Sequence, residues 1–177
     1  INNMGNIFLG QGKYEEGLRK YERSLAIDEK SHGKGHVSTA PTCINIGIVN
    51  DGKGDHAAAL RSYSRAAEIA AAAQGKNNMV SAWSLALSAV THTALGGTDE
   101  ADEAASCIDA ATAMLKAMTG NMAAAVGVLQ VVLSGKEAAH GSEHAACAPV
   151  LLVMAQLHDA DGDSDKAAAL RQRAEGC

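Results

Sequence analysis

The chain has 177 residues, of which 47% are apolar and 3% aromatic, and its formal net charge is −5. This length suits one domain or one short repeat array, and the apolar content excludes disorder of the chain as a whole. The scarcity of aromatic residues and the presence of only two prolines disfavour a β-sandwich or β-barrel. The acidic balance argues against nucleic acid as a partner, and no apolar run is long enough to predict a membrane span.

Segments with helical spacing of apolar residues follow one another along the chain. Between residues 14 and 27, for example, apolar or small side chains stand at 14, 17, 18, 21, 24, 25 and 27. Glycines separate the segments, and glycine can cap a helix and turn the chain. The pattern predicts an all-α fold of about nine helices, at residues 1–10, 13–31, 37–51, 55–74, 78–95, 99–118, 121–139, 145–159 and 164–175. The short loops make consecutive helices antiparallel neighbours.

The chain also repeats itself. At an offset of 42, identical residues recur at positions 3 and 45, 5 and 47, 21 and 63, 23 and 65, and 27 and 69. A later copy has the offset 108, because EKSHGKGHVSTAP (29–41) returns as EAAHGSEHAACAP (137–149). Since 108 is not a multiple of 42, an irregular helix must interrupt the array. We therefore expect one domain, 1–177, with repeats near 1–42, 43–84 and 85–120, an irregular helix at 121–139 and a last helix pair at 140–177.

The first 36 residues carry a motif of a known repeat family. They read INNMGNIFLGQGKYEEGLRKYERSLAIDEKSHGKGH. This segment resembles a tetratricopeptide repeat (TPR), and more narrowly the 42-residue repeat typical of kinesin light chains. Residues 1–5 stand for that family's LNNLA element, residues 11–17 for its turn, and Glu29, Gly33 and His36 for its extended helix end. The resemblance implies a right-handed superhelical solenoid of antiparallel helix pairs.

The family pattern assigns packing roles to small and large residues. Small residues let the two helices of a pair approach closely, and large ones fill the space beside them. Each pair leaves an apolar face that the next pair covers. Leucine at position 59 or 104 would therefore overpack a helix-pair contact. On this pattern the repeat-packing residues are Gly5, Phe8, Gly17, Tyr21, Gly47, Ala59, Tyr63, Ala104, Ala155 and Ala167.

The resemblance also implies a concave groove that holds a peptide or another protein. The family's second asparagine, here Asn3 and Asn45, lines that groove and can hydrogen-bond an extended peptide. The later positions hold Leu87 and Val153, so peptide clamping is expected in the N-terminal half. Helix capping and solvation explain these asparagines equally well. The candidate partner-binding residues are Asn2, Asn3, Asn6, Asn45 and Ile48.

Two patterns resemble metal-binding sites but are better explained as turn and helix-capping residues. His32 and His36, like His140 and His144, have a spacing that can bind metal, but each pair straddles a His-Gly turn. The aspartates of residues 159–165 lack the glycine and glutamate of a calcium loop and are interpreted as capping the helix that begins near Ser164. No metal and no cofactor are expected.

The sequence contains no catalytic motif, so we do not expect an enzyme. Four widely spaced cysteines are interpreted as buried or incidental thiols in a reducing intracellular compartment. The chain begins with isoleucine, which suggests a fragment of a longer chain, in which any targeting signal would lie upstream of Ile1. A basic helix face at positions 13, 19, 20 and 23 is interpreted as solvated.

The leading functional hypothesis is a non-enzymatic protein–protein interaction scaffold, a subunit or segment of a larger assembly. The few aromatic residues favour a large, shallow interface. The first alternative is a reversible peptide-binding cargo adaptor resembling kinesin light chain. The second alternative is a regulatory TPR module of a longer enzyme or signalling protein.

Overall fold

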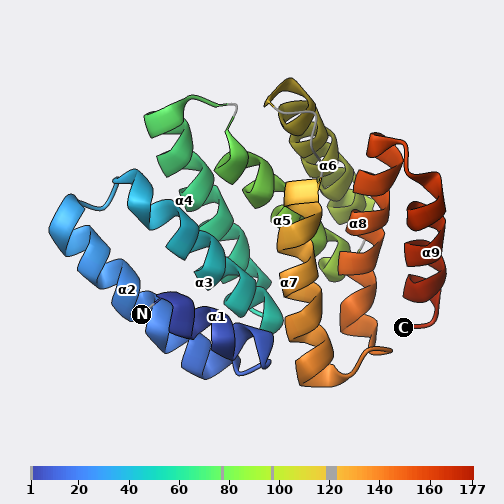
Figure 1. Cartoon of the computed structure of the whole chain (residues 1–177), viewed down its shortest axis with the longest axis horizontal. Helices are drawn as coiled ribbons and strands as arrows, with labels where there is room; N and C mark the ends of the chain where they lie inside the picture. The colour runs from blue at the N-terminus through green and yellow to red at the C-terminus, as the bar shows by residue number, and fades with distance from the viewer. Residues whose placement is uncertain (1, 77, 97, 119–122) are drawn as a thin grey trace.

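The computed structural model describes residues 2–76, 78–96, 98–118 and 123–177, and the regular structure in these ranges is helical. The helices are α1 (Asn2–Gly10), α2 (Tyr14–His32), α3 (Ala40–Gly52), α4 (His56–Gln74), α5 (Met79–Leu95), α6 (Thr98–Met118), α7 (Ala123–His140), α8 (Ala148–Asp161) and α9 (Ser164–Glu175) (Figure 1). None of these described helices is long and apolar enough to span a bilayer. The helical segments expected from the sequence are confirmed in number and order.

Two helices begin a few residues later than the sequence suggests. Single 3-10 turns, Val37–Thr39 and Ala145–Cys147, precede α3 and α8. Pro41 and Pro149 stand in the first turn of the α-helix that follows. Proline suits this position because the first amides of a helix have no intrahelical acceptor.

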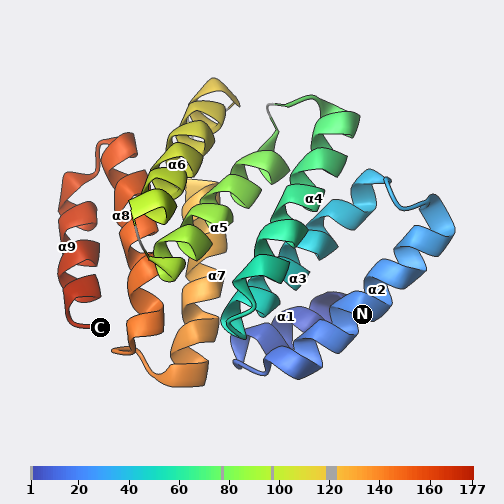
Figure 2. The same ribbon diagram turned by 180° about the vertical axis from the view of Figure 1, so that it is seen from behind.

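The helices form four antiparallel pairs, α1–α2, α3–α4, α5–α6 and α8–α9. The first helices of the pairs contact one another in succession, and we call α1, α3, α5 and α8 the inner row. Figures 1 and 2 show the pairs side by side as in a solenoid of helix pairs, which confirms the expected all-α, TPR-like fold class.

A glycine facing a tyrosine sets the spacing of the first two pairs. A Cβ atom added at Gly5 would lie 2.4 Å from Cε1 of Tyr21, and one added at Gly47 would lie 2.4 Å from Cε1 of Tyr63. Both tyrosine side chains are buried. Glycine is required at these positions because any side chain would collide with the ring. The 42-residue repeat thus corresponds to a repeated packing contact.

The other expected packing residues are small side chains within the pairs, together with the large side chain of Phe8. Gly17 is buried close to the backbone of α1, and a Cβ added there would meet Phe8 and Val49 at 3.7 Å. Phe8 is half-buried. The remaining expected packing residues are all buried: Ala59, Ala104, Ala155 and Ala167.

The seventh helix departs from the stacking of pairs. α7 contacts α1, α3, α5 and α8, which are all four helices of the inner row. It lies in front of α5 in Figure 1 and behind α5 in Figure 2. Its buried residues recur at helical spacing, as expected for a helix with one covered face: Ala125, Leu129, Val132, Leu133 and Lys136. The irregular helix expected at 121–139 is therefore a helix laid across the inner row. Residues 121 and 122 lie outside the described part of the chain.

The α2–α3 and α7–α8 connections share one local structure. The rings of His32 and His36 stack with centroids 4.9 Å apart, and those of His140 and His144 do the same. Nδ1 of His36 and Nδ1 of His144 each accept a hydrogen bond from the amide two residues further on. The second histidine of each pair thus caps a 3-10 turn. Among the described residues, no group of three or more potential ligands could hold a metal ion.

Candidate functional site

A cleft of about 380 Å³ opens on the inner row, between α1, α3 and the start of α5. Its floor is apolar, because Leu9, Ile44 and Ile48 are each at most 4% exposed. Trp83 of α5 is partly exposed. The residues that line the cleft are Asn6, Leu9, Pro41, Ile44, Asn45, Ile48 and Trp83. An apolar cleft with a few placed polar groups is the usual form of a binding site in proteins.

Two side-chain amides stand together at this cleft. The Tyr21 hydroxyl donates to Oδ1 of Asn6 over 2.7 Å, and Nδ2 of Asn45 donates to the same oxygen over 3.4 Å. Both contacts use the Asn6 oxygen. These two contacts leave the Asn6 amide nitrogen able to donate and the Asn45 amide oxygen able to accept, which complements a peptide group.

The cleft gathers three of the five candidate partner-binding residues, Asn6, Asn45 and Ile48. Asn3 is exposed on α1 and is not part of the cleft lining. Asn2 is the first residue of α1, and its side chain lies outside the described part of the chain.

Sequence analysis missed the aromatic wall of the cleft. Trp83 is the only tryptophan, and it aligns with Pro41 at the 42-residue offset, so the repeat pattern gives it no role. Pro41 is the second residue of α3, and Trp83 is the fifth residue of α5. The sequence signal for a role of Trp83 was its size, because the equivalent position in the preceding repeat holds the smaller Pro41.

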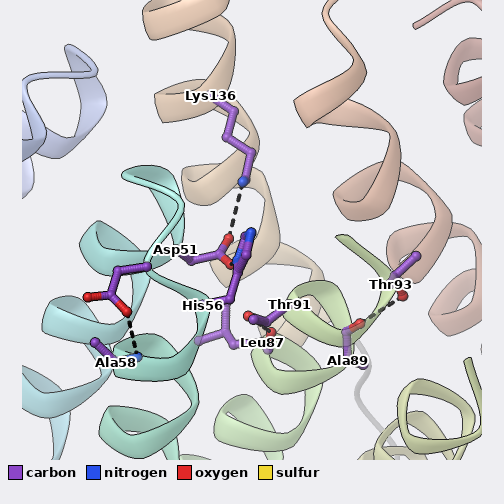
Figure 3. Close-up of polar contacts among 9 residues, drawn as sticks. Asp51, His56, Ala58, Leu87, Ala89, Thr91, Thr93 and Lys136 are labelled. Atoms are coloured by element: carbon purple, nitrogen blue, oxygen red, sulfur yellow. Dashed lines mark hydrogen bonds and ion pairs between the residues drawn. The ribbon is translucent and has the colours of Figure 1, made fainter. Parts of the chain in front are cut away.

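A buried ion pair fastens α7 to the inner row (Figure 3). Nζ of Lys136 lies 3.1 Å from Oδ2 of Asp51, and the two side chains are 7% and 2% exposed. Nδ1 of His56 lies 2.8 Å from the other carboxylate oxygen of Asp51. Both oxygens of Asp51 are thus engaged. Lys136 shares the buried face of α7 with Leu129 and Val132, and its place three residues after the apolar run 122–133 was the sequence signal for this contact.

Burial favours the neutral form of several phenols and thiols. Burial raises the pKa of Tyr14 to about 12, with a smaller contribution from the negative charge of Asp51. Burial also raises the pKa of Tyr63 and of Tyr21. The pKa values of three thiols are raised by the same cause, which lowers their thiolate fraction: Cys43, Cys107 and Cys147.

The aspartate-rich segment 159–165 is engaged in helix capping and an ion pair. The carboxylate of Asp163 accepts a hydrogen bond from the backbone amide of Lys166, and it also pairs with the Lys166 ammonium over 2.5 Å. Asp159 forms an ion pair with Arg171 of α9. The interpretation of this segment as a helix cap is confirmed at Asp163.

Comparison with known proteins agrees with this geometry. Residues 1–72 match the model of the tetratricopeptide repeat family. No curated protein sequence matches the chain significantly. Among solved structures, the fold is similar to a kinesin light chain of Podosopora anserina with nearly identical TPR-like repeats: TM-score 0.58, 16% identity, covering 98% of this chain and 91% of that one. It is also similar to BtubC of P. vanneervenii: TM-score 0.55, 14% identity, covering 97% and 75%.

Proposed function

We propose that this chain, a solenoid of kinesin light chain-like tetratricopeptide repeats, is a non-enzymatic interaction module that binds an extended segment of a partner protein in the cleft between α1, α3 and α5. Tetratricopeptide repeats generally mediate protein–protein interaction. The observation that carries the proposal is the amide pair of Asn6 and Asn45 beside an apolar floor. This is the combination that an extended peptide needs.

The position of α7 limits what the inner row can accept. Because α7 contacts all four inner helices, it covers inner-row surface that a long helical partner would need. The cleft beside it accommodates a short segment, with an apolar side chain against Ile44, Ile48 and Trp83. The peptide backbone would then bond to the amides of Asn6 and Asn45. The short cleft beside α7 supports the hypothesis of reversible peptide binding over that of a large, shallow interface with a partner protein.

A peptide library displayed on phage tests the proposal. Peptides selected on the native chain should bind it and lose at least tenfold in affinity for Asn45→Arg, whose side chain fills the cleft. Asn3→Arg places the same charge at the equivalent position of the preceding repeat, outside the cleft, and should bind like the native chain. Failure to select any peptide, or equal binding to all three proteins, would contradict the proposal.

The second candidate is a permanent subunit of a larger assembly. It is favoured by the exposure of several large apolar side chains, which are Met4, Ile7, Ile27, Leu95 and Leu152. Crosslinking and mass spectrometry of the protein from its source would reveal this role. One stoichiometric set of proteins linked to Lys13, Lys20, Lys53 or Lys76 supports it, whereas varied substoichiometric partners support the peptide-binding function.

A further inference from the structure

A second cleft, of about 440 Å³, lies where α7 meets the turn between α3 and α4. Its floor is charged and buried, because the side chains of Asp51 and Lys136 are only 2% and 7% exposed. Its rim is basic, with Lys53 on one side and the stacked rings of His140 and His144 on the other. The volume lies in the range of small-molecule sites. This basic cleft shares no lining residue with the peptide cleft.

Basic groups outnumber acidic ones in the lining of the basic cleft. Asp51 is the one carboxylate among the lining residues, and its two oxygens are engaged by Lys136 and His56. Lys53 on the rim is paired with Glu15 of α2 over 2.8 Å. An anion that enters the cleft therefore meets no unpaired carboxylate in its lining. The basic lining residues are Lys53, His56, Lys136, His140 and His144.

The buried ammonium group of Lys136 has more donors than partners. An ammonium carries three N–H donors, and among the described residues Lys136 pairs with one group, the carboxylate of Asp51, over 3.1 Å. Figure 3 shows this ammonium and the ring of His56 meeting at the Asp51 carboxylate. Because a buried donor without an acceptor costs free energy, an oxygen of a ligand beside Lys136 would be bound favourably.

Two histidines of the cleft are oriented by hydrogen bonds on Nδ1. Nδ1 of His144 accepts from the amide of Ala146 over 3.1 Å, so the neutral ring carries its proton on Nε2 and can donate it to an anion. Nδ1 of His56 lies 2.8 Å from Asp51, and an ionised carboxylate only accepts, so this nitrogen carries the proton. Nε2 is then the ligand-binding nitrogen of both rings.

The turn between α2 and α3 has the same histidine pair without the lysine. At the offset of 108, His32 and His36 correspond to His140 and His144, and their rings stack in the same way. The position equivalent to Lys136 holds Asp28, which has the opposite charge. The histidine pair is therefore a feature of the repeated turn, whereas the lysine is particular to α7.

We propose that the basic cleft binds a small organic phosphate monoester. The phosphate oxygens accept from the ammonium of Lys136 and from Nε2 of His144, while Lys53 and His56 add positive charge. Donors from several elements suit the three terminal oxygens of a phosphate better than the two of a carboxylate. The rest of the ligand is compact and apolar, because the remaining walls include small apolar residues: Ala94, Ala145, Ala146 and Pro149.

Titration calorimetry of the full 177-residue chain with phenyl phosphate tests the proposal. We expect one saturable site, together with a melting temperature that rises with ligand concentration, because the ligand binds the folded chain. Inorganic phosphate lacks the apolar body and benzoate lacks the phosphate, so each should bind about tenfold more weakly. The absence of saturable binding, or binding of either compound as tight as that of phenyl phosphate, would overturn the proposal.

Matched variants locate the ligand. The double variant Asp51→Asn, Lys136→Met removes the ammonium without leaving a buried charge unpaired, and should weaken binding of phenyl phosphate about tenfold. His144→Asn keeps an acceptor for the Ala146 amide, removes the Nε2 donor and should also weaken binding. His36→Asn makes the same change at the equivalent turn and should bind like the native chain. Native affinity in His144→Asn, or equal losses in His144→Asn and His36→Asn, would overturn the proposal even if the double variant failed to fold.

The basic cleft and the peptide cleft can be tested independently. Backbone NMR shifts caused by phenyl phosphate should fall on the end of α7, on the α7–α8 connection and on the α3–α4 turn. Shifts confined to Asn6, Asn45 and Trp83 would overturn the proposal, because the compound would then occupy the peptide cleft. Asn45→Arg, which should abolish peptide binding, should leave the affinity for phenyl phosphate unchanged.

Discussion

The ammonium group of Lys136 lies 3.1 Å from the carboxylate of Asp51, although 85 positions separate the two residues and both side chains are buried. This contact joins the one helix that interrupts the repeat array to the second helix of the inner row. Asp51 also holds His56 through its other oxygen. The position of α7 thus depends on a charge pair as well as on apolar contacts.

Removing one partner of this pair should destabilise the protein strongly. Asp51→Asn leaves the Lys136 charge buried without a counter-charge, which we expect to lower the free energy of unfolding by about 3–5 kcal/mol. The double variant Asp51→Asn, Lys136→Met should recover most of the loss, because no uncompensated charge remains. Urea denaturation of the native chain, the single variant and the double variant measures the three free energies of unfolding. The control is Glu15→Gln, which breaks the exposed Lys53–Glu15 pair and should leave stability nearly unchanged. Equal losses in the single and double variants would contradict this account.

The glycine that faces Tyr63 should not tolerate a methyl group. A Cβ at position 47 would lie 2.4 Å from Cε1 of Tyr63, so Gly47→Ala forces the buried ring to move and should cost about 1–3 kcal/mol. Gly127→Ala is the matched control, since a Cβ there meets nothing within 4 Å on α7. It should stabilise the protein by up to about 1 kcal/mol because alanine favours helix more than glycine does. In thermal unfolding, we expect the melting temperature to fall for Gly47→Ala and to rise for Gly127→Ala.

The repeat pattern predicted the pairs well because their residues interact at short range. Gly47 and Tyr63 belong to one pair, so the spacing of special residues along the chain carries the contact. The position of α7 is different, because it depends on Lys136 meeting Asp51 of a distant repeat, and no periodicity encodes that meeting. The presence of Trp83 in the cleft was not predicted from the sequence for a similar reason. Its role follows from the packing of α5 beside α3.

Leucine substitutions at two equivalent alanines should have different effects. Sequence analysis expects overpacking at both. Ala59 is 0% exposed, and Ala59→Leu should cost about 1–3 kcal/mol. Ala104 instead borders a cavity of about 420 Å³ between α5, α6, α8 and α9, so the added atoms of Ala104→Leu have space and the cost should be smaller. Calorimetric unfolding of both variants measures the difference. A larger loss at position 104 than at 59 would show that this cavity is closed in solution.

Stability should fall at alkaline pH because the buried tyrosines resist ionisation. The pKa of Tyr14 is raised from 10.0 to about 12 in the folded chain, chiefly by burial. The unfolded chain therefore loses this proton first, so the contribution of Tyr14 to stability is fully present below pH 10 and is lost as the pH rises toward 12. Urea denaturation between pH 9 and pH 12, with phenolate absorbance recorded in parallel, measures the loss. Tyr14→Phe keeps the ring against Gly52, removes a buried hydroxyl that has no hydrogen-bond partner among the described residues, and should show a shallower decline. Parallel declines in the two proteins would mean that Tyr14 ionises as readily in the folded chain as in the unfolded one.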